Sequence, residues 1–174
     1  MPPNNCPTNM RPTASGCMDQ YEYPNLSNQM PLADNTYAQA VQACKELGKH
    51  LCTNTEWLDV CSNQTTTRWP YGNVYRERTC NDHGWVDTET HGNATASGTF
   101  SECRTKNEVY DMSGNLWEWV DANGSGQLRG GGWQLSAGLG QCRSAMTPAP
   151  NYHAGETGFR CCTTPMESKA LLHY

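Results

Sequence analysis

The sequence predicts a single α+β domain with an irregular, loop-rich backbone stapled by disulfides. Its 174 residues fit one domain and are enough to bury a sizeable core. The chain contains 16 glycines and 10 prolines, and turn signals rich in Gly, Asn and Asp recur along it, which is typical of short strands joined by loops. It also contains ten cysteines, an even number that favours five disulfides formed in an oxidising compartment.

Metal binding by the cysteines is the alternative interpretation. A structural zinc site needs cysteine or histidine pairs at ligand spacing, such as C-x-x-C, and the sequence contains none. The five histidines are scattered along the chain, at His50, His83, His91, His153 and His173. The composition therefore favours disulfides over zinc.

Two segments carry the signals of short helices. The first begins with a capping box formed by Thr36 and Gln39 and ends at Gly48, which tolerates a left-handed backbone. The second begins with a capping box formed by Thr53 and Glu56. The apolar positions expected to face the core are Ala40, Val41, Cys44 and Leu47 in the first helix, and Trp57, Val60 and Cys61 in the second. The rest of the chain is expected to form short strands and loops.

Charge and hydropathy exclude several classes of protein. Charged residues make up 17% of the chain, the formal net charge is −5, and no run of like charge occurs, so a nucleic-acid-binding protein is not expected. No apolar run is long enough for a transmembrane segment. The N-terminal residues lack the pattern of a signal peptide, yet the cysteines favour a secreted, periplasmic or cell-surface protein. We therefore expect a mature domain that carries an added start methionine.

Five stretches, taken together and in this order, resemble the formylglycine-generating enzyme or sulfatase-modifying factor family. They are "CMDQYEYPN" (17–25), "ACKELGKHLCTNTEWLDVC" (43–61), "WPYG" (69–72), "VYDMSGNLWEWV" (109–120), and "LRGGGW" with "GFRCC" (128–133 and 158–162). The resemblance implies an irregular variant of the C-type lectin fold, with two short helices packed on small antiparallel sheets. It also implies a domain over residues 17–165, with an N-terminal extension (1–16) and a C-terminal tail (166–174).

The resemblance implies two disulfides as well. Family members often tie the first helix to the cysteine of the "GFRC" motif, and the second helix to a cysteine after the glycine motif. In this sequence those pairs are Cys44–Cys161 and Cys61–Cys142. The other six cysteines depart from the catalytic members of the family. For them we expect Cys80–Cys103, Cys6–Cys17 and Cys52–Cys162.

The "SGNLWEWV" stretch reads as a strand with both faces occupied. The resemblance implies a calcium site there, with Glu118 as carboxylate ligand beside carbonyl oxygens of Ser113, Gly114 and Leu116, because calcium prefers six to eight oxygen ligands. The alternative is that Glu118 pairs with an arginine, Arg129 or Arg160. A second calcium site of the family would fall near Asn81 and Asp82, but the spacing there differs too much for the assignment to be transferred.

The chemistry of the family's enzymes requires two reactive cysteines just after the glycine motif, which bind copper(I). Between Trp133 and Gln141 the sequence contains no cysteine, and Cys142 matches the family's structural cysteine instead. Neither copper nor formylglycine-generating activity is therefore expected. A Ser136–His153 dyad is the remaining catalytic alternative, and the sequence shows no acid to orient it.

The segment between the glycine motif and "GFR" has the composition of a contact surface. Aromatic and amide side chains with little charge suit the recognition of a protein or a glycan. The same bracket resembles the variable region of diversity-generating retroelement proteins, which display variable side chains on this fold. We therefore expect a non-catalytic ligand-binding domain. Its expected recognition residues are Trp133, Gln134, Leu135, Ser136, Leu139, Gln141, Arg143, Asn151, Tyr152 and His153.

Three alternatives to this interpretation remain. Trp133 and Leu135 could belong to the core, with the rest of the segment a solvated loop. The protein could be an oxidase-family enzyme with relocated chemistry, or a structural subunit of an extracellular assembly. A binding domain should expose an aromatic cluster around Trp133 and Tyr152, whereas a structural subunit should expose a flat apolar patch.

Overall fold

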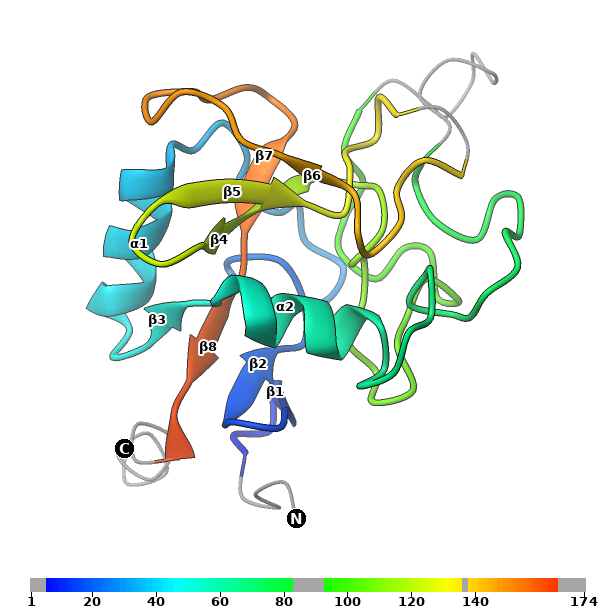
Figure 1. The fold of residues 1–174 in the computed structure, drawn as a ribbon, viewed down its shortest axis with the longest axis horizontal. Coiled ribbons are helices and arrows are strands. Elements are labelled where there is room, and N and C mark those ends of the chain that lie inside the picture. Colours follow the sequence, from blue (N-terminus) through cyan, green and yellow to red (C-terminus); the bar gives the residue numbers. More distant parts are fainter. Residues whose placement is uncertain (1–5, 83–92, 136–137, 166–174) are drawn as a thin grey trace.

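Two four-stranded sheets and two helices form the domain, joined by long loops (Figure 1). The computed structural model describes residues 6–82, 93–135 and 138–165. The strands of the first sheet are β1 (Met10–Pro12), β2 (Cys17–Asp19), β3 (His50–Leu51) and β8 (Cys161–Thr163). Their order is β1-β2-β8-β3, and all three pairings are antiparallel. The sheet therefore brings together the two ends of the described chain.

The second sheet carries the "WEW" and glycine motifs. Its strands are β4 (Trp117–Asp121), β5 (Gly126–Arg129), β6 (Ala145–Met146) and β7 (Thr157–Phe159). Their order is β6-β5-β4-β7. The expectation of antiparallel sheets holds for every pairing except one, because β4 and β7 run parallel. The chain between β4 and β7 is long and includes β5 and β6. Such a connection permits a parallel pairing, which a tight hairpin does not.

The "GFRCC" motif is divided between the two sheets. β7 ends at Phe159 and β8 begins at Cys161, so Arg160 lies at the junction, where it is fully buried. Gly158 is required in β7, because a Cβ atom there would overlap the side chain of Leu116. One continuous stretch thereby joins both sheets.

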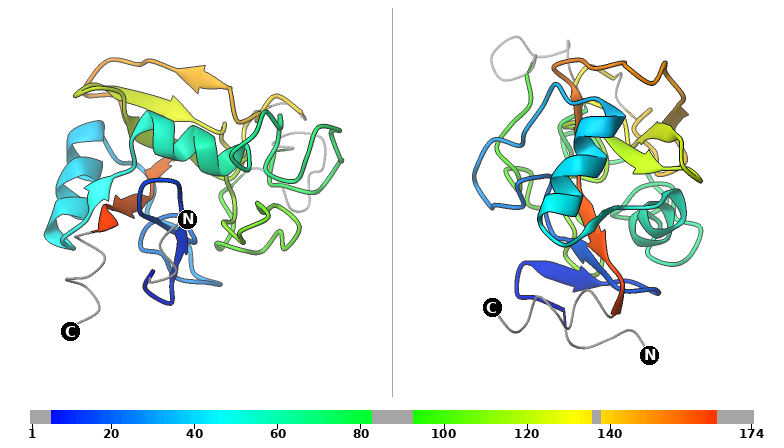
Figure 2. Two further views of the ribbon diagram at one scale, coloured as in Figure 1. Left: turned by 60° about the horizontal axis from the view of Figure 1, so that its bottom comes forward. Right: turned by 90° about the vertical axis from the view of Figure 1, so that its left-hand side faces the viewer.

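Both predicted helices form, with the predicted capping boxes. α1 (Tyr37–Glu46) begins after Thr36, whose backbone N–H donates to Gln39 Oε1 at 2.8 Å. α2 (Asn54–Cys61) begins after Thr53, whose backbone N–H donates to Glu56 Oε2 at 2.8 Å. These bonds satisfy the free donors of each first turn. Figure 2 shows α2 lying between the second sheet and the β1–β2 pair.

Two groups of buried side chains fill the interior. Trp57 of α2 packs with Met112 and Val120 in one cluster, and Trp119 of β4 packs with Phe159 of β7 in the other. Trp119 also donates from its indole nitrogen to the carbonyl oxygen of Asn35 at 2.7 Å, which satisfies its one polar group. Tryptophans thus supply much of the core area in a chain with few long helices.

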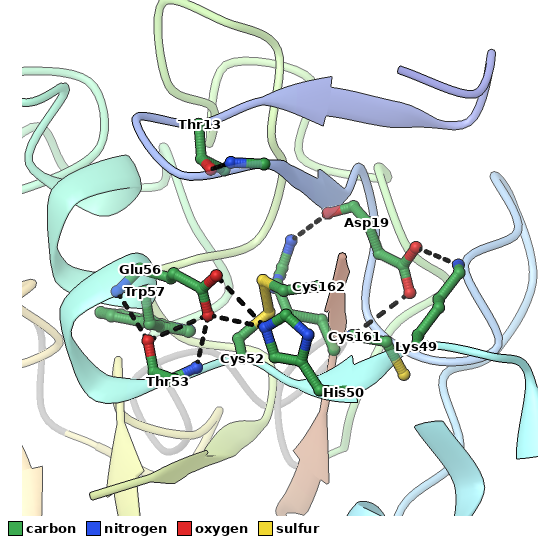
Figure 3. The surroundings of a disulfide bond; sticks show 12 residues. Thr13, Asp19, Lys49, His50, Cys52, Thr53, Glu56, Trp57, Cys161 and Cys162 are labelled. Atoms are coloured by element: carbon green, nitrogen blue, oxygen red, sulfur yellow. Dashed lines mark hydrogen bonds and ion pairs between the residues drawn. A yellow bond between two sulfur atoms is a disulfide. The ribbon is translucent and has the colours of Figure 1, made fainter. Parts of the chain in front are cut away.

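All ten cysteines form disulfides, in the pairs expected from the sequence. They are Cys6–Cys17, Cys44–Cys161, Cys52–Cys162, Cys61–Cys142 and Cys80–Cys103. Figure 3 shows the bond between Cys52, which precedes the N-cap residue of α2, and Cys162 of β8. Beside it, Lys49 donates to Asp19 of β2 at 2.5 Å. Burial raises the pKa of Asp19 and the Lys49 charge opposes that rise, so the pair stabilises the ionised carboxylate.

Part of the expected N-terminal extension (1–16) belongs to the folded domain. Residues 10–12 form β1, which pairs with β2, and Cys6 is bonded to Cys17. The sequence did not predict this strand, because it is only three residues long and lies among prolines and turn residues. The tail 166–174 lies outside the described residues. Within them, no helix is long and apolar enough to cross a membrane.

Candidate functional site

The glycine motif fixes the point where the chain leaves β5. Gly130 and Gly131 both adopt left-handed backbone angles, with φ of 82° and 77°. A Cβ atom on Gly130 would lie 2.9 Å from the carbonyl oxygen of Met112, closer than real side chains come. The backbone N–H of Trp133 then donates to the carbonyl oxygen of Asn115 at 2.8 Å. The segment that follows is therefore anchored on the start of β4.

The expected recognition residues divide into an exposed and a half-buried group. The exposed ones are Gln134, Leu139, Arg143, Asn151 and His153. The half-buried ones are Trp133, Leu135, Gln141 and Tyr152. Ser136 lies outside the described residues. We call the exposed group, together with Trp133 and Tyr152 at its margin, the recognition surface.

The half-buried side chains pack against the interior of the domain. Leu135 and Tyr152 pack against the core cluster that contains Trp119 and Phe159, and Leu135 also contacts Gly131. The indole nitrogen of Trp133 is buried and has no hydrogen-bond partner in the described part of the chain. Trp133 and Tyr152 thus expose only part of their rings, which is less than a fully exposed aromatic cluster.

His153 has an acidic neighbour that the sequence did not reveal. Its Nδ1 lies 2.8 Å from Asp34 Oδ1, and both side chains are more than half exposed, at 56% and 61%. Asp34 comes from the loop before α1, and no local signal links positions 119 residues apart. The pair ties the 147–156 loop to this earlier loop. No dyad can be assigned, because Ser136 is outside the described residues.

A cavity of about 410 Å³ lies at the edge of the recognition surface. It opens between the C-terminal end of α2 and the residues after the glycine motif, and Asp59, Thr65, Arg129 and Arg143 line it. Arg129 is fixed there by Asn54 Oδ1, which accepts from its Nε at 2.8 Å, and burial lowers the pKa of Arg129. Of these lining residues, only Arg143 was expected in the recognition site, because nothing in the sequence indicates that the end of α2 meets Arg129 there.

Glu118 pairs with Arg160, which is the arginine alternative. Arg160 donates to Glu118 from Nη2 at 2.5 Å and from Nε at 2.7 Å, and both side chains are fully buried. The indole nitrogen of Trp57 donates to the same carboxylate at 2.6 Å. Arg129 instead bonds Asn54 and Gln127.

This ion pair limits the fit of calcium to the predicted ligand set. A carboxylate has about four lone-pair sites, and three donors already occupy Glu118. The described residues contain no group of three or more His, Cys, Asp or Glu side chains that could hold a metal ion. Ser113, Gly114, Leu116 and Glu118 fit calcium only if the ion shares Glu118 with Arg160. Calcium at this set stays a prediction.

Two more buried carboxyls face Arg160. Burial raises the pKa of Glu22 well above its usual range, and the nearby charges of Asp111 and Glu118 raise it further. Burial also raises the pKa of Asp111 to about 7, although Asp111 accepts a backbone N–H bond from Gly98 at 2.7 Å. Arg160 is thus one cation among three acidic groups, and burial together with their mutual repulsion favours the protonated forms of Glu22 and Asp111.

The cysteines offer no copper ligand. All ten are in disulfides, and Cys142, the one nearest the glycine motif, is bonded to Cys61. Copper(I) selects soft thiolates, which a disulfide does not supply. The free thiolate pair that the resemblance implies for copper(I) is therefore not present among these cysteines, and the absence of copper stays a prediction.

Several solved structures share this fold at low sequence identity. The Treponema denticola variable protein 1 matches with a TM-score of 0.64 and 17% identity, over 79% of this chain and 72% of that one. PvdO from Pseudomonas aeruginosa matches with a TM-score of 0.64 and 19% identity, over 79% and 62%. The U1 variant of the Major Tropism Determinant matches with a TM-score of 0.65 and 15% identity, over 94% and 54%. At these identities the likeness concerns the fold, which is the irregular C-type-lectin-like fold.

The sequence itself matches a family model across most of its length. No curated protein matches it in sequence. The model of the sulfatase-modifying factor enzyme 1-like domain matches residues 8–165, which includes both helices and all eight strands. The chain belongs to the sulfatase-modifying factor enzyme 1-like family, as a member without the reactive cysteine pair.

Proposed function

We propose that this protein is a non-catalytic binding domain that recognises a protein or glycan ligand through the surface between Trp133 and His153. The observation that carries the proposal is a contrast within one segment. The side chains of Gln134, Arg143 and Asn151 are exposed and make no side-chain hydrogen bond to the described scaffold. The residues on either side are fixed by glycines, disulfides and the second sheet.

The names of two fold relatives agree with this proposal. One is called a variable protein, and another is a tropism determinant solved in several variants. If this chain serves a similar purpose, its exposed residues can change while the fold is kept. Retroelement-driven diversification of the segment is part of the proposal, and the ligand's identity is open to experiment.

The proposed location is secreted, periplasmic or at a cell surface. Five disulfides are typical of an oxidising compartment. No nucleic-acid partner is proposed, because the chain has a net charge of −5.

Sequencing of this gene from many individuals of its source population tests the proposal most directly. Substitutions concentrated between Trp133 and His153, with "VYDMSGNLWEWV" and "GFRCC" constant, would support a diversified recognition surface. An invariant segment would remove diversification and leave a fixed ligand or a structural role.

A binding screen with matched variants tests recognition itself. The probes are a glycan array and a displayed random-peptide library. We expect ligands selected on the native chain to lose binding to the Gln134→Ala, Arg143→Ala double variant. They should keep binding to the Gln42→Ala, Lys45→Ala double variant, which likewise removes one exposed amide and one exposed cation, from α1. Equal binding to both variants would place recognition elsewhere. Concentration-dependent self-association without any selected ligand would favour the structural subunit.

Calcium is tested separately. If calcium binds at Ser113, Gly114, Leu116 and Glu118, it stabilises the native state by mass action, and the thermal midpoint rises on calcium addition and falls with a chelator. The Glu118→Gln variant then shows no such response. If the thermal midpoint of the native chain changes neither with calcium nor with the chelator, Glu118 has Arg160 as its charged partner and calcium does not bind at this set.

A further inference from the structure

A second concave region lies outside the recognition surface and is lined by cations. Its volume is about 200 Å³, and its lining includes Asn63, Tyr71, Arg76, Glu102, Arg104 and Lys106. We call it the basic groove. None of the residues between Trp133 and His153 lines it. It is formed instead by the residues after α2, the 69–76 loop and the 102–106 turn.

The basic groove has a positive charge in an acidic protein. Three of its lining residues are cations and one is an acid, whereas the whole chain has a net charge of −5. Arg104 is partly neutralised, since it lies 3.8 Å from Glu102 and 3.9 Å from Glu108. Arg76 and Lys106 have no carboxylate within 4.0 Å among the described residues. Their charges are available to a ligand.

Asn63 holds the three segments of the basic groove together. Its Oδ1 accepts from the backbone N–H of Lys106 at 2.7 Å, and its Nδ2 donates to the carbonyl oxygen of Pro70 at 2.9 Å. Asn63 adopts a left-handed backbone with φ of 55°, which asparagine tolerates better than most residues. Behind the groove, Cys103 is bonded to Cys80. The groove is therefore a built feature and does not depend on the chance position of surface side chains.

Arg76 is oriented by an aromatic stack. Its guanidinium carbon lies 4.7 Å from the centre of the Tyr71 ring, and that ring stacks on Trp69 at 6.2 Å with an interplanar angle of 11°. Trp69 is only 5% exposed, so the stack rests on the interior. The stack therefore holds the Arg76 guanidinium in one position beside the groove.

We propose that the basic groove binds the oxyanion of a small acidic ligand, meaning a carboxylate, sulfate or phosphate group held by Arg76 and Lys106. Hydrogen bonds from charged donors to such groups are short and strong, and the planar guanidinium matches their geometry. The volume is below the range of about 300–1,000 Å³ usual for drug-sized ligands, so the groove suits one anionic group with little attached to it.

Titration of the full chain with sodium sulfate, sodium phosphate and sodium glucuronate tests the proposal. Backbone amide shifts in NMR spectra give a local readout, and we expect the largest changes at Gly72 and Lys106. The Arg76→Gln, Lys106→Gln double variant should bind about tenfold or more weakly, since each substitution removes a charged donor. Both side chains are exposed, so the variant should keep the native circular dichroism spectrum.

The matched control is Arg68→Gln, which removes an exposed cation outside the groove lining. It should bind like the native chain. The proposal is overturned if no anion shifts the groove amides, or if Arg68→Gln weakens binding as much as the double variant does. The order of affinities identifies the source: preference for glucuronate indicates a carboxylated sugar, and preference for sulfate or phosphate indicates a free or esterified inorganic anion.

Discussion

The buried charge cluster at the junction of the two sheets predicts a marked asymmetry between two substitutions. Arg160 is a fully buried cation that faces Glu22, Asp111 and Glu118. Removing one partner of a buried ion pair costs about 3–5 kcal/mol. Glu118→Gln should lower the free energy of unfolding by about 3 kcal/mol, the lower end of this range. Two carboxyls still face Arg160 in this variant, and the amide oxygen can still accept a hydrogen bond from Trp57.

Arg160→Met should cost more, about 5 kcal/mol or above. It leaves the buried acidic groups without their cation, and it also deprives the carbonyl oxygen of Tyr110 of a donor at 2.8 Å. The assay is guanidinium unfolding with the disulfides intact, followed by tryptophan fluorescence. The two variants should unfold as cooperatively as the native chain.

The pH dependence separates charge from lost hydrogen bonds. Without Arg160, the pKa values of the buried carboxyls rise further, while in the unfolded chain they remain near 4. A raised folded-state pKa means that stability is complete below the unfolded value and is lost as pH rises. The loss of unfolding free energy caused by Arg160→Met should therefore grow between pH 5 and pH 8. The part of that loss that comes from the carbonyl without its donor should be the same at both pH values. A pH-independent cost, or a cost no larger than that of Glu118→Gln, would refute the reasoning.

Three further predictions concern single features. Burial raises the pKa of Asp111 to about 7 from an unfolded value near 4, so Asp111→Asn should raise the unfolding free energy by about 1.5 kcal/mol at pH 5 and by up to about 4 kcal/mol at pH 8, in unfolding experiments at the two pH values. Replacing Cys61 and Cys142 by serine opens a loop with a sequence separation of 81, and the unfolding free energy should fall by about 4.5 kcal/mol. Arg143, which is exposed, should accept most substitutions within about 0.5 kcal/mol, whereas Gly158→Ala should lower the thermal midpoint strongly; equal tolerance at both positions would contradict the division between surface and scaffold.

The features that the sequence predicted well depend on local chemistry or on the family's motifs. The capping boxes at Thr36 and Thr53 need only residues three positions apart, and both form. Two of the disulfide pairs, Cys44–Cys161 and Cys61–Cys142, followed from the resemblance to the family, whereas the other three pairs were expected without support from its motifs. The expected alternative in which Arg160 pairs with Glu118 is also confirmed.

The features that it did not predict join distant segments. The parallel pairing of β4 with β7 links residues about forty positions apart, and the residues between them carry no signal of strand direction. The Asp34–His153 contact and the Asp19–Lys49 ion pair likewise join segments that are distant in the sequence, and no motif connects them. The basic groove depends on one amide, Asn63, that meets two other loops. Turn propensity marks such an asparagine as a loop residue but gives no indication of its partners.

The two proposed sites differ in a way that follows from how each is held. In the recognition surface, the exposed side chains of Gln134, Arg143 and Asn151 form no hydrogen bond with other described residues, although glycines and a disulfide fix the backbone nearby. Substitutions at these positions should therefore cost the fold little stability. Arg76 and Asn63, by contrast, are themselves part of the structure that orients the basic groove. A surface of the first kind suits ligands that vary, and a groove of the second kind suits one constant chemical group. If both proposals hold, the constant anion site and the variable surface serve different ligands on one disulfide-bonded scaffold.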